Sequence, residues 1–189
     1  MTVSMRRVWR AVRPALPASR RHIRRARPDE SVLLTQLERA ASEAELGHVF
    51  DPHRYPYPTA DVERRWQDLL HDPLTSVRIL EVAGKPVGFV AFDGQTVLHL
   101  GVAPEQTRRG YGSALLRNAA AEIFNAGGSV ARLWVLTENT TARRFYARLG
   151  WTDTGGRRAC EFPPYPEELE LSHPNPAPPT PALRDRDSA

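Results

Sequence analysis

The chain has 189 residues, of which 41% are hydrophobic and 25% are charged, so it is long and apolar enough to form one globular domain with a buried core. Its apolar runs have the length of strands, and arginines and a proline interrupt the N-terminal run, so we expect no membrane span. The single cysteine, Cys160, cannot form an internal disulfide, and we therefore expect a reducing, cytoplasmic location.

The net charge of +4 is unevenly distributed along the chain. Residues 1–28 contain nine arginines and no acid, so the rest of the chain must carry a net charge of −5. Such a composition is typical of a disordered leader, which we place at residues 1–21; weak binding to nucleic acid or anionic lipid and an organelle transit peptide are also compatible with it. Because the body is acidic, we expect no specific nucleic-acid partner. Residues 173–189 are rich in proline and predict a disordered tail, which leaves one domain at residues 22–172.

The N-terminal half of this domain predicts a strand, two helices and three more strands. Residues 21–28 fit a strand, residues 29–48 have apolar positions at helical spacing, and a second helix is expected to begin at a Thr59 cap. Three strand-like runs then cover residues 76–104, and the Asp93-Gly94 pair before the last of them is typical of a hairpin turn. We therefore expect an antiparallel meander of three strands.

The C-terminal half returns to alternating helices and strands. A helix is expected from about Arg108 to the glycines at 127–128, followed by a strand at residues 130–137. Asn139 is a typical cap for a short helix that Gly150 closes, and two or three short strands complete the domain. This order predicts a mixed α/β sheet with helices packed on it rather than regular βαβ repeats.

The segment TRRGYGSALL, residues 107–116, combines two arginines and two glycines at the start of a helix. It is not a Walker loop, because the only lysine is Lys85, and it lacks the third glycine of a dinucleotide fingerprint, because Leu115 stands there. A helix start offers unpaired N–H groups and a partial positive charge, and glycine lets an anion approach the backbone. Taken alone, the segment fits an anion site and a tight turn with surface arginines equally well.

A second motif at residues 139–151 favours the anion site. With the first it resembles the GNAT superfamily of N-acyltransferases, and the resemblance covers about residues 22–172. The elements that carry it are Val102-Ala103-Pro104, Thr107 to Gly112, Asn139, Ala142, Phe145-Tyr146 and Leu149-Gly150-Trp151. The resemblance implies a mixed, mostly antiparallel sheet of six to seven strands, flanked by about four helices and splayed between the fourth and fifth strands.

The same resemblance implies direct transfer of an acetyl group from acetyl-CoA to a primary amine of a small molecule or peptide, by a monomer or homodimer and without a metal. The alternative is a non-catalytic acyl-CoA sensor of the same fold. Thr107 departs from the usual Gln or Arg. The implied cofactor-binding residues are Leu100, Gly101, Val102, Thr107, Arg108, Arg109, Gly110, Tyr111, Gly112, Ser113, Asn139, Ala142 and Tyr146.

The chemistry needs a proton donor for the departing thiolate and a base for the amine. Tyr146 is the expected general acid, since a phenol titrates close to a thiol. His99 is a possible base, although strand alternation turns it away from Leu98 and Leu100 unless a bulge intervenes, and a structural role or a water chain are alternatives. Asp93 and Glu81 are weaker candidates.

The acceptor site is expected in two proline-rich loops, residues 48–59 and 161–169. Their tyrosines, Tyr55, Tyr57 and Tyr165, are the candidate substrate-binding residues, and they fit a role in sealing the core equally well. The acids of the second loop are expected to attract a cationic amine; they are Glu161, Glu167 and Glu168.

Overall fold

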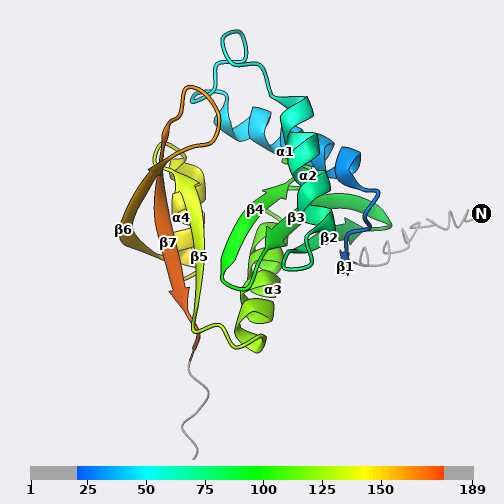
Figure 1. Ribbon diagram of the computed structural model, residues 1–189, viewed down its shortest axis with the longest axis vertical. Coiled ribbons are helices and arrows are strands. Elements are labelled where there is room, and N and C mark those ends of the chain that lie inside the picture. The colour runs from blue at the N-terminus through cyan, green and yellow to red at the C-terminus, as the bar shows by residue number, and fades with distance from the viewer. Residues whose placement is uncertain (1–20, 177–189) are drawn as a thin grey trace, which may run out of the picture.

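The computed structural model describes residues 21–176 and contains a seven-stranded sheet with helices on both faces (Figure 1). The spatial order of the strands is β1-β2-β3-β4-β5-β7-β6. In chain order the elements are β1 (Arg21–Arg25), α1 (Ser31–Leu46), α2 (Thr59–His71), β2 (Ser76–Val82), β3 (Lys85–Phe92), β4 (Thr96–Val102), the 3-10 turn η1 (Pro104–Gln106), α3 (Tyr111–Asn125), β5 (Val130–Leu136), α4 (Thr140–Arg148), β6 (Thr152–Ala159) and β7 (Glu167–Pro174).

The sheet is antiparallel except at its centre. The strands β2, β3 and β4 form the predicted meander, and β5, β7 and β6 form a second antiparallel group. The two groups meet through a short parallel pairing of β4 with β5, in which only Thr96 and Val97 have partners, Arg132 and Leu133. Beyond that pairing the two strands diverge towards α1 (Figure 1). The predicted fold class is thus confirmed, including the splay between the fourth and fifth strands.

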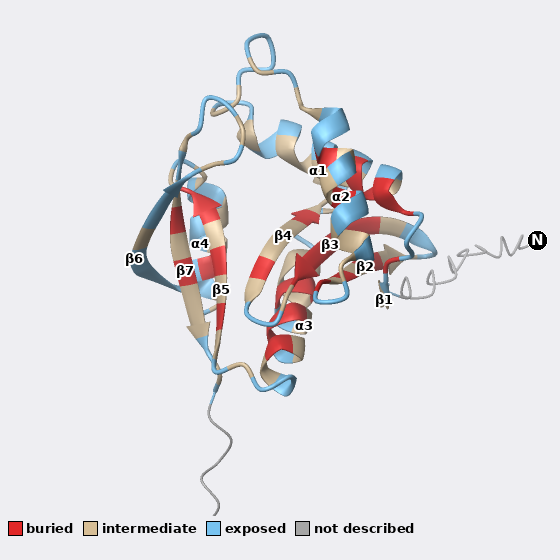
Figure 2. Cartoon of the chain, viewed as in Figure 1, coloured by how far each residue is buried: buried red, intermediate tan, exposed pale blue. Residues whose placement is uncertain are grey.

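Two hydrophobic clusters hold the helices to the sheet. On one face α3 and α4 pack on the strands through residues such as Leu115, Leu116 and Tyr146. On the other face α1 and α2 bury Leu34 and Trp66 against the meander. Figure 2 shows the resulting burial in β3 and the inner side of α3, whereas β6 at the sheet edge is almost wholly exposed.

The helix starts differ in part from the prediction. Asn139 caps α4 as expected, because its side-chain oxygen accepts a hydrogen bond of 2.9 Å from the Ala142 N–H. Thr59 does not cap α2: Pro58 holds the cap position, and the Thr59 hydroxyl donates to the Tyr57 carbonyl at 3.4 Å. The third helix begins at Tyr111 rather than Arg108, because left-handed backbone at Arg108 and Gly110 delays its start.

The first and last of the described strands extend slightly beyond residues 22–172. The first strand begins at Arg21, and β7 continues to Pro174 because His173 stacks on Trp151, with ring centroids 5.5 Å apart. Residues 1–20 and 177–189, most of the predicted leader and tail, lie outside the described residues. Within residues 21–176, no helix has the length and apolar character needed to cross a bilayer.

Candidate active site

The free edge of β4 forms one wall of the candidate site. From His99 to Val102 the strand pairs with β3, and among the described residues it has no partner on the side of β5. An extended ligand segment can therefore add to this edge as a strand does. Internal packing explains why residue 101 is a glycine, since a Cβ there would lie 2.6 Å from the ring of Phe89.

A cradle of backbone N–H groups follows this edge, formed by residues 108–113. The first hydrogen bond of α3 runs from the Ala114 N–H to the Gly110 carbonyl, and within the described part of the chain the N–H groups of the cradle have no acceptor. Positive φ angles of 59° at Arg108 and 80° at Gly110 turn the loop into the helix. Arg108 and Arg109 are exposed and pair with no acid among residues 21–176. The cradle can thus offer several donors and two positive charges to an anion.

Gly112 is the residue of this cradle that internal packing explains least. A Cβ at Gly112 would make ordinary contacts, 3.5 Å from the ring of Phe145 and 3.7 Å from Val102. Its backbone is not in the left-handed region, so the fold accepts a larger residue there. Glycine at this position is therefore better explained by the close approach of a bound anion. The contact with Phe145 also places the N-terminal end of α3 beside α4.

Thr107 and Asn139 use their side chains for local structure. The Thr107 hydroxyl donates to the Pro104 carbonyl at 2.9 Å and closes the turn η1. Asn139 holds the first turn of α4 through Ala142, which in turn packs against the core of the domain. Both residues thus shape the backbone around the free edge of β4.

Tyr146, the predicted proton donor, belongs to the same hydrophobic cluster as Leu100 and Val102 of β4. Its side chain is 9% exposed, and its ring centroid lies 5.2 Å from that of Phe145 and 6.3 Å from that of Trp151. Burial, and to a lesser extent the negative charge of Glu45, raise the pKa of the Tyr146 phenol above its ordinary value. The side chain is therefore a neutral phenol at physiological pH, with a proton to donate.

A bulge in β4 brings His99 to the face covered by α1 and α2. Opposite β3, Val97 pairs with Phe92 and His99 with Ala91, so Leu98 is the extra residue. His99 then packs against Trp66, with ring centroids 5.3 Å apart. Burial lowers the pKa of His99 to about 3, with smaller contributions from the charges of Arg65 and Arg158. The imidazole is thus neutral but a weak base, which weakens the case for His99 as the general base.

A pocket of about 170 Å³ opens between α1 and the end of β4, close to the cradle. The sequence contains no signal for a pocket on this side of α1, because apolar positions at helical spacing usually mark contact with the core. Burial instead concentrates at Leu34, whereas Ala40 and Ala44 are exposed. The pocket is lined by Ala41, Ala44, Glu45, Val102, Pro104 and Thr107.

The three candidate acceptor tyrosines do not come together. Tyr57 packs in the cluster under α1 and α2 with its hydroxyl buried and without a partner among the described residues, and the guanidinium of Arg39 lies 5.9 Å from its ring centroid. Tyr55 lies beside Arg54 in the loop before α2. Tyr165 is 60% exposed in the β6–β7 loop.

Arg65 of α2 joins the second predicted acceptor loop to α1, a role that no pattern in the sequence indicates. Its guanidinium donates to Glu38 of α1 at 2.6 Å and to Glu161 of the β6–β7 loop at 3.2 Å. It also lies 5.7 Å from the ring centroid of Phe162, which packs in the same cluster as Tyr57. The contact thus fixes the β6–β7 loop against the two N-terminal helices.

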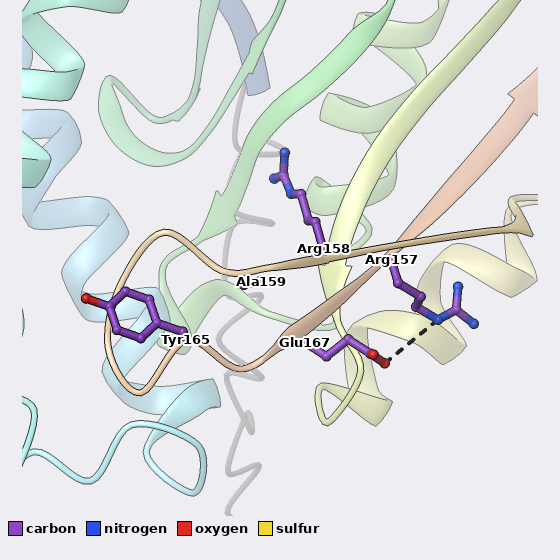
Figure 3. Close-up of a pocket in the computed structure, with 5 residues that line it drawn as sticks. All are labelled: Arg157, Arg158, Ala159, Tyr165 and Glu167. Atoms are coloured by element: carbon purple, nitrogen blue, oxygen red, sulfur yellow. Dashed lines mark ion pairs between the residues drawn. The ribbon is translucent and has the colours of Figure 1, made fainter.

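A second pocket, of about 270 Å³, lies at the base of this loop and is drawn in Figure 3. Arg158 points from β6 towards the space between β4 and β5, with its guanidinium 4.4 Å from the ring centroid of Trp134 (Figure 3). The predicted acids are paired with arginines, Glu167 with Arg157 at 3.8 Å and Glu168 with Arg158 at 2.7 Å. This pairing leaves them less able to attract a cationic amine than the sequence suggested. Among residues 21–176 no cluster of His, Cys, Asp or Glu is suited to a metal ion.

The two central strands of the sheet diverge, and the helix start beside them has unpaired N–H groups. This is the arrangement expected from the resemblance to the GNAT superfamily. The profile of the Acetyltransferase (GNAT) family matches residues 33–151, more than half of the chain. The chain therefore belongs to this family.

Two archaeal relatives are named as N-acetyltransferases. An uncharacterized N-acetyltransferase of Archaeoglobus fulgidus is 34% identical over 98 residues, which cover 46% of this chain and 67% of the relative. One of Methanocaldococcus jannaschii is 36% identical over 86 residues, which cover 40% of this chain and 38% of the relative. The chain thus matches well under half the length of the second relative.

Solved structures confirm the fold over most of the chain. The PaiA N-acetyltransferase of Thermoplasma acidophilum, solved with coenzyme A, has a TM-score of 0.61 at 15% identity, covering 82% of this chain and 99% of that one. The ribosomal-protein-S18-alanine N-acetyltransferase of Escherichia coli has a TM-score of 0.65 at 20% identity, covering 85% and 98%.

Proposed function

We propose that this protein transfers an acetyl group from acetyl-CoA directly to a primary amine. The observation that carries the proposal is the cradle of unpaired N–H groups at residues 108–113, which continues the free edge of β4 and leads to the buried phenol of Tyr146. Family membership and a neighbour solved with coenzyme A support it.

Each part of acetyl-CoA has a place in this proposal. The diphosphate binds the cradle, where Gly112 leaves the backbone accessible and Arg108 and Arg109 add charge. The pantetheine arm extends along residues 98–102 of β4 and forms main-chain hydrogen bonds with its free edge. The thioester then lies near Tyr146, the residue proposed to donate a proton to sulfur.

The reaction forms one bond and breaks one bond. The nitrogen of a neutral amine attacks the thioester carbonyl, a C–N bond forms, and the C–S bond breaks. The amine loses a proton to a base, and the departing sulfur receives one from the Tyr146 phenol. We propose that the protein acts in the cytoplasm, as a monomer or homodimer and without a metal.

The acceptor is proposed only as a class, a small-molecule amine or the amino group of a peptide. The neighbour from Escherichia coli is named for an alanine of a ribosomal protein, so the amino group of a peptide is one candidate. The two sides of the acceptor site would be the loop before α2 and the β6–β7 loop, the second of which Arg65 holds against α1 and α2.

Thiol release from acetyl-CoA tests the proposal. We expect CoA release above the hydrolysis background with at least one amine from a panel of spermidine, lysine and a short peptide that begins with alanine. Calorimetry with acetyl-CoA is the parallel measurement. Tight binding without release for any amine would instead indicate an acyl-CoA sensor, and absence of binding would contradict the assignment of the cradle.

A further inference from the structure

We propose that Glu45, on the last turn of α1, is the general base that takes the proton from the acceptor amine. The inference rests on the proposed acetyl transfer and names a residue for the proton acceptor that the sequence left open. The position of α1 over the opened part of the sheet is the first observation that supports it.

The C-terminal end of α1 contacts both sides of this opening. On the β4 side, Glu45 lines the pocket that ends at Val102 and Thr107, next to the cradle. On the β5 side, a ring nitrogen of His48 lies 3.5 Å from the carbonyl oxygen of Glu138, directly before α4. Figure 1 shows this end of α1 above the point where β4 and β5 diverge. Glu45 thus faces the opened part of the sheet beside the free edge of β4, and its charge reaches the Tyr146 phenol.

The carboxylate of Glu45 is also available for proton transfer. It forms no hydrogen bond or ion pair with another residue between 21 and 176, and the residue is accessible to solvent, from which an amine arrives. The carboxylates on the acceptor side are occupied, since Glu38 and Glu161 pair with Arg65. Glu45 is close enough to Tyr146 for its charge to raise the pKa of that phenol.

The surroundings of Glu45 favour a base over a permanently ionised acid. Partial desolvation in the pocket raises the pKa of Glu45 above its ordinary value, so its carboxylate binds a proton more readily than an exposed one. The burial of His99 has the opposite effect, because it lowers that pKa to about 3. The other titratable or charged groups on the elements around Glu45 are Glu38, Arg39 and Glu43 on α1, Arg143, Arg144, Tyr146 and Arg148 on α4, and His48, Glu105, Arg108, Arg109 and Glu138 in the connecting segments.

The proposed step balances without a further reactant. The acceptor first loses one proton from its ammonium group to solvent. As the neutral nitrogen then forms the C–N bond, it gives a second proton to the Glu45 carboxylate. The electrons of the C–S bond leave with sulfur, which takes the proton of Tyr146. Exchange with solvent then returns the proton from Glu45 to water and restores the Tyr146 phenol.

The variant Glu45→Gln tests the assignment in the full chain, with the amine of the panel that wild type acetylates best. We expect kcat to fall about 100-fold, the usual contribution of a general base, while the calorimetric affinity for acetyl-CoA stays within about twofold of wild type. The acidic limb of the kcat profile should also disappear, because that limb reports protonation of Glu45. Glu43→Gln is the matched control, since Glu43 lies on the same helix, exposed and paired with Arg39, and its turnover should equal wild type.

Chemical rescue separates a proton acceptor from a merely structural residue. Formate added to Glu45→Ala should raise turnover at least about tenfold, since a small carboxylate fits the space that the side chain vacates. Wild-type turnover and an unchanged pH profile in Glu45→Gln would overturn the inference while leaving acetyl transfer intact. If wild type itself releases no thiol with any amine, both the base and the proposed function are overturned.

Discussion

The two ends of the candidate site consist of different kinds of groups, backbone N–H groups at one end and charged side chains at the other. The cradle at residues 108–113 uses backbone N–H groups and a glycine that packing does not require. The acceptor side uses ion pairs between long side chains, above all those of Arg65 with Glu38 and Glu161. A cradle of backbone N–H groups suits the part of the ligands that does not vary, such as a diphosphate. A network of side chains is easily altered by substitution to fit another acceptor. We therefore expect changes in the cradle to affect cofactor affinity, and changes in the network to affect amine use.

The largest effect is expected from Gly112→Glu. The added carboxylate would occupy the place of the diphosphate and repel it, and the loss of two charge-assisted hydrogen bonds alone corresponds to an affinity decrease of about 100-fold or more. The fold should be unaffected, because a Cβ at Gly112 makes ordinary contacts and an acid is favourable at a helix start. Calorimetry with acetyl-CoA checks this.

Gly94→Glu is the matched control for charge and size. Gly94 lies in the β3–β4 hairpin with open space around a Cβ, so this variant should bind acetyl-CoA like wild type. Equal affinity in the two variants would show that the cradle does not hold the diphosphate.

The next largest effect is expected from Tyr146→Phe. Removing the phenolic proton donor should lower kcat about 100-fold, with acetyl-CoA affinity within about twofold of wild type because the ring still packs against Phe145 and Trp151. The active form is the protonated phenol, and its raised pKa moves the loss of activity to higher pH, so ionisation of Tyr146 should cause no alkaline decrease up to about pH 10. Unchanged turnover in the variant would remove the acid role.

The sequence predicts the backbone of the cradle more directly than the contacts of the acceptor side, for a physical reason. The cradle residues 108–113 are contiguous, and glycines at a helix start expose backbone N–H groups, so a short motif was enough to predict unpaired donors there. That these donors bind a diphosphate stays a prediction. Arg65, Glu38 and Phe162 come from three separate segments, and only the folded chain brings them together. The sequence contains no signal for the proposed base Glu45 for another reason: an acid on an amphipathic helix usually lies on the solvated face.

Most of the fold was also predictable, because hydrophobic period and turn residues are local. The differences arose where tertiary contacts decide: Pro58 rather than Thr59 at the cap of α2, the bulge at Leu98 and the last two residues of β7. The roles of Tyr146 and His99 stay predictions that the following experiments, with those above, can decide.

Arg65→Ala is expected to act on the acceptor side alone. Freeing the β6–β7 loop should raise the KM for the amine about tenfold, equivalent to about 1.4 kcal/mol, and leave the affinity for acetyl-CoA unchanged. The free energy of unfolding should fall by about 2 kcal/mol, because Arg65 and Glu38 are both largely buried and the variant leaves Glu38 with fewer partners. Urea unfolding and amine kinetics measure the two effects.

Arg64→Ala provides the comparison for Arg65. The two arginines are adjacent, but Arg64 pairs with Asp61 on an exposed helix face, where such pairs contribute about 0.5 kcal/mol or less. Equal losses in the two variants, or a fall in acetyl-CoA affinity for Arg65→Ala, would contradict the division of the site into two parts.

The smallest effect on turnover is expected from His99→Asn. Since burial lowers the pKa of His99 to about 3, the imidazole stays neutral above about pH 5 and contributes no titration to the kcat profile between about pH 5 and 8. Turnover should therefore stay within about threefold of wild type, and a limb near about pH 6.5 that the variant abolishes would restore His99 as the base.

The lowered pKa of His99 should be visible in the pH dependence of the free energy of unfolding, although it is not visible in turnover. The folded pKa lies below the unfolded value of about 6.5, so the unfolded chain binds the proton more tightly, and wild type loses stability as pH falls from about 6.5 towards 3. The slope from this one group is at most about 1.4 kcal/mol per pH unit, and it should be absent in His99→Asn. Chemical unfolding of both proteins between about pH 4 and 8 measures the difference. Parallel curves would mean that the imidazole is solvated in the folded protein, and a solvated imidazole with an ordinary pKa could compete with Glu45 for the proton of the amine.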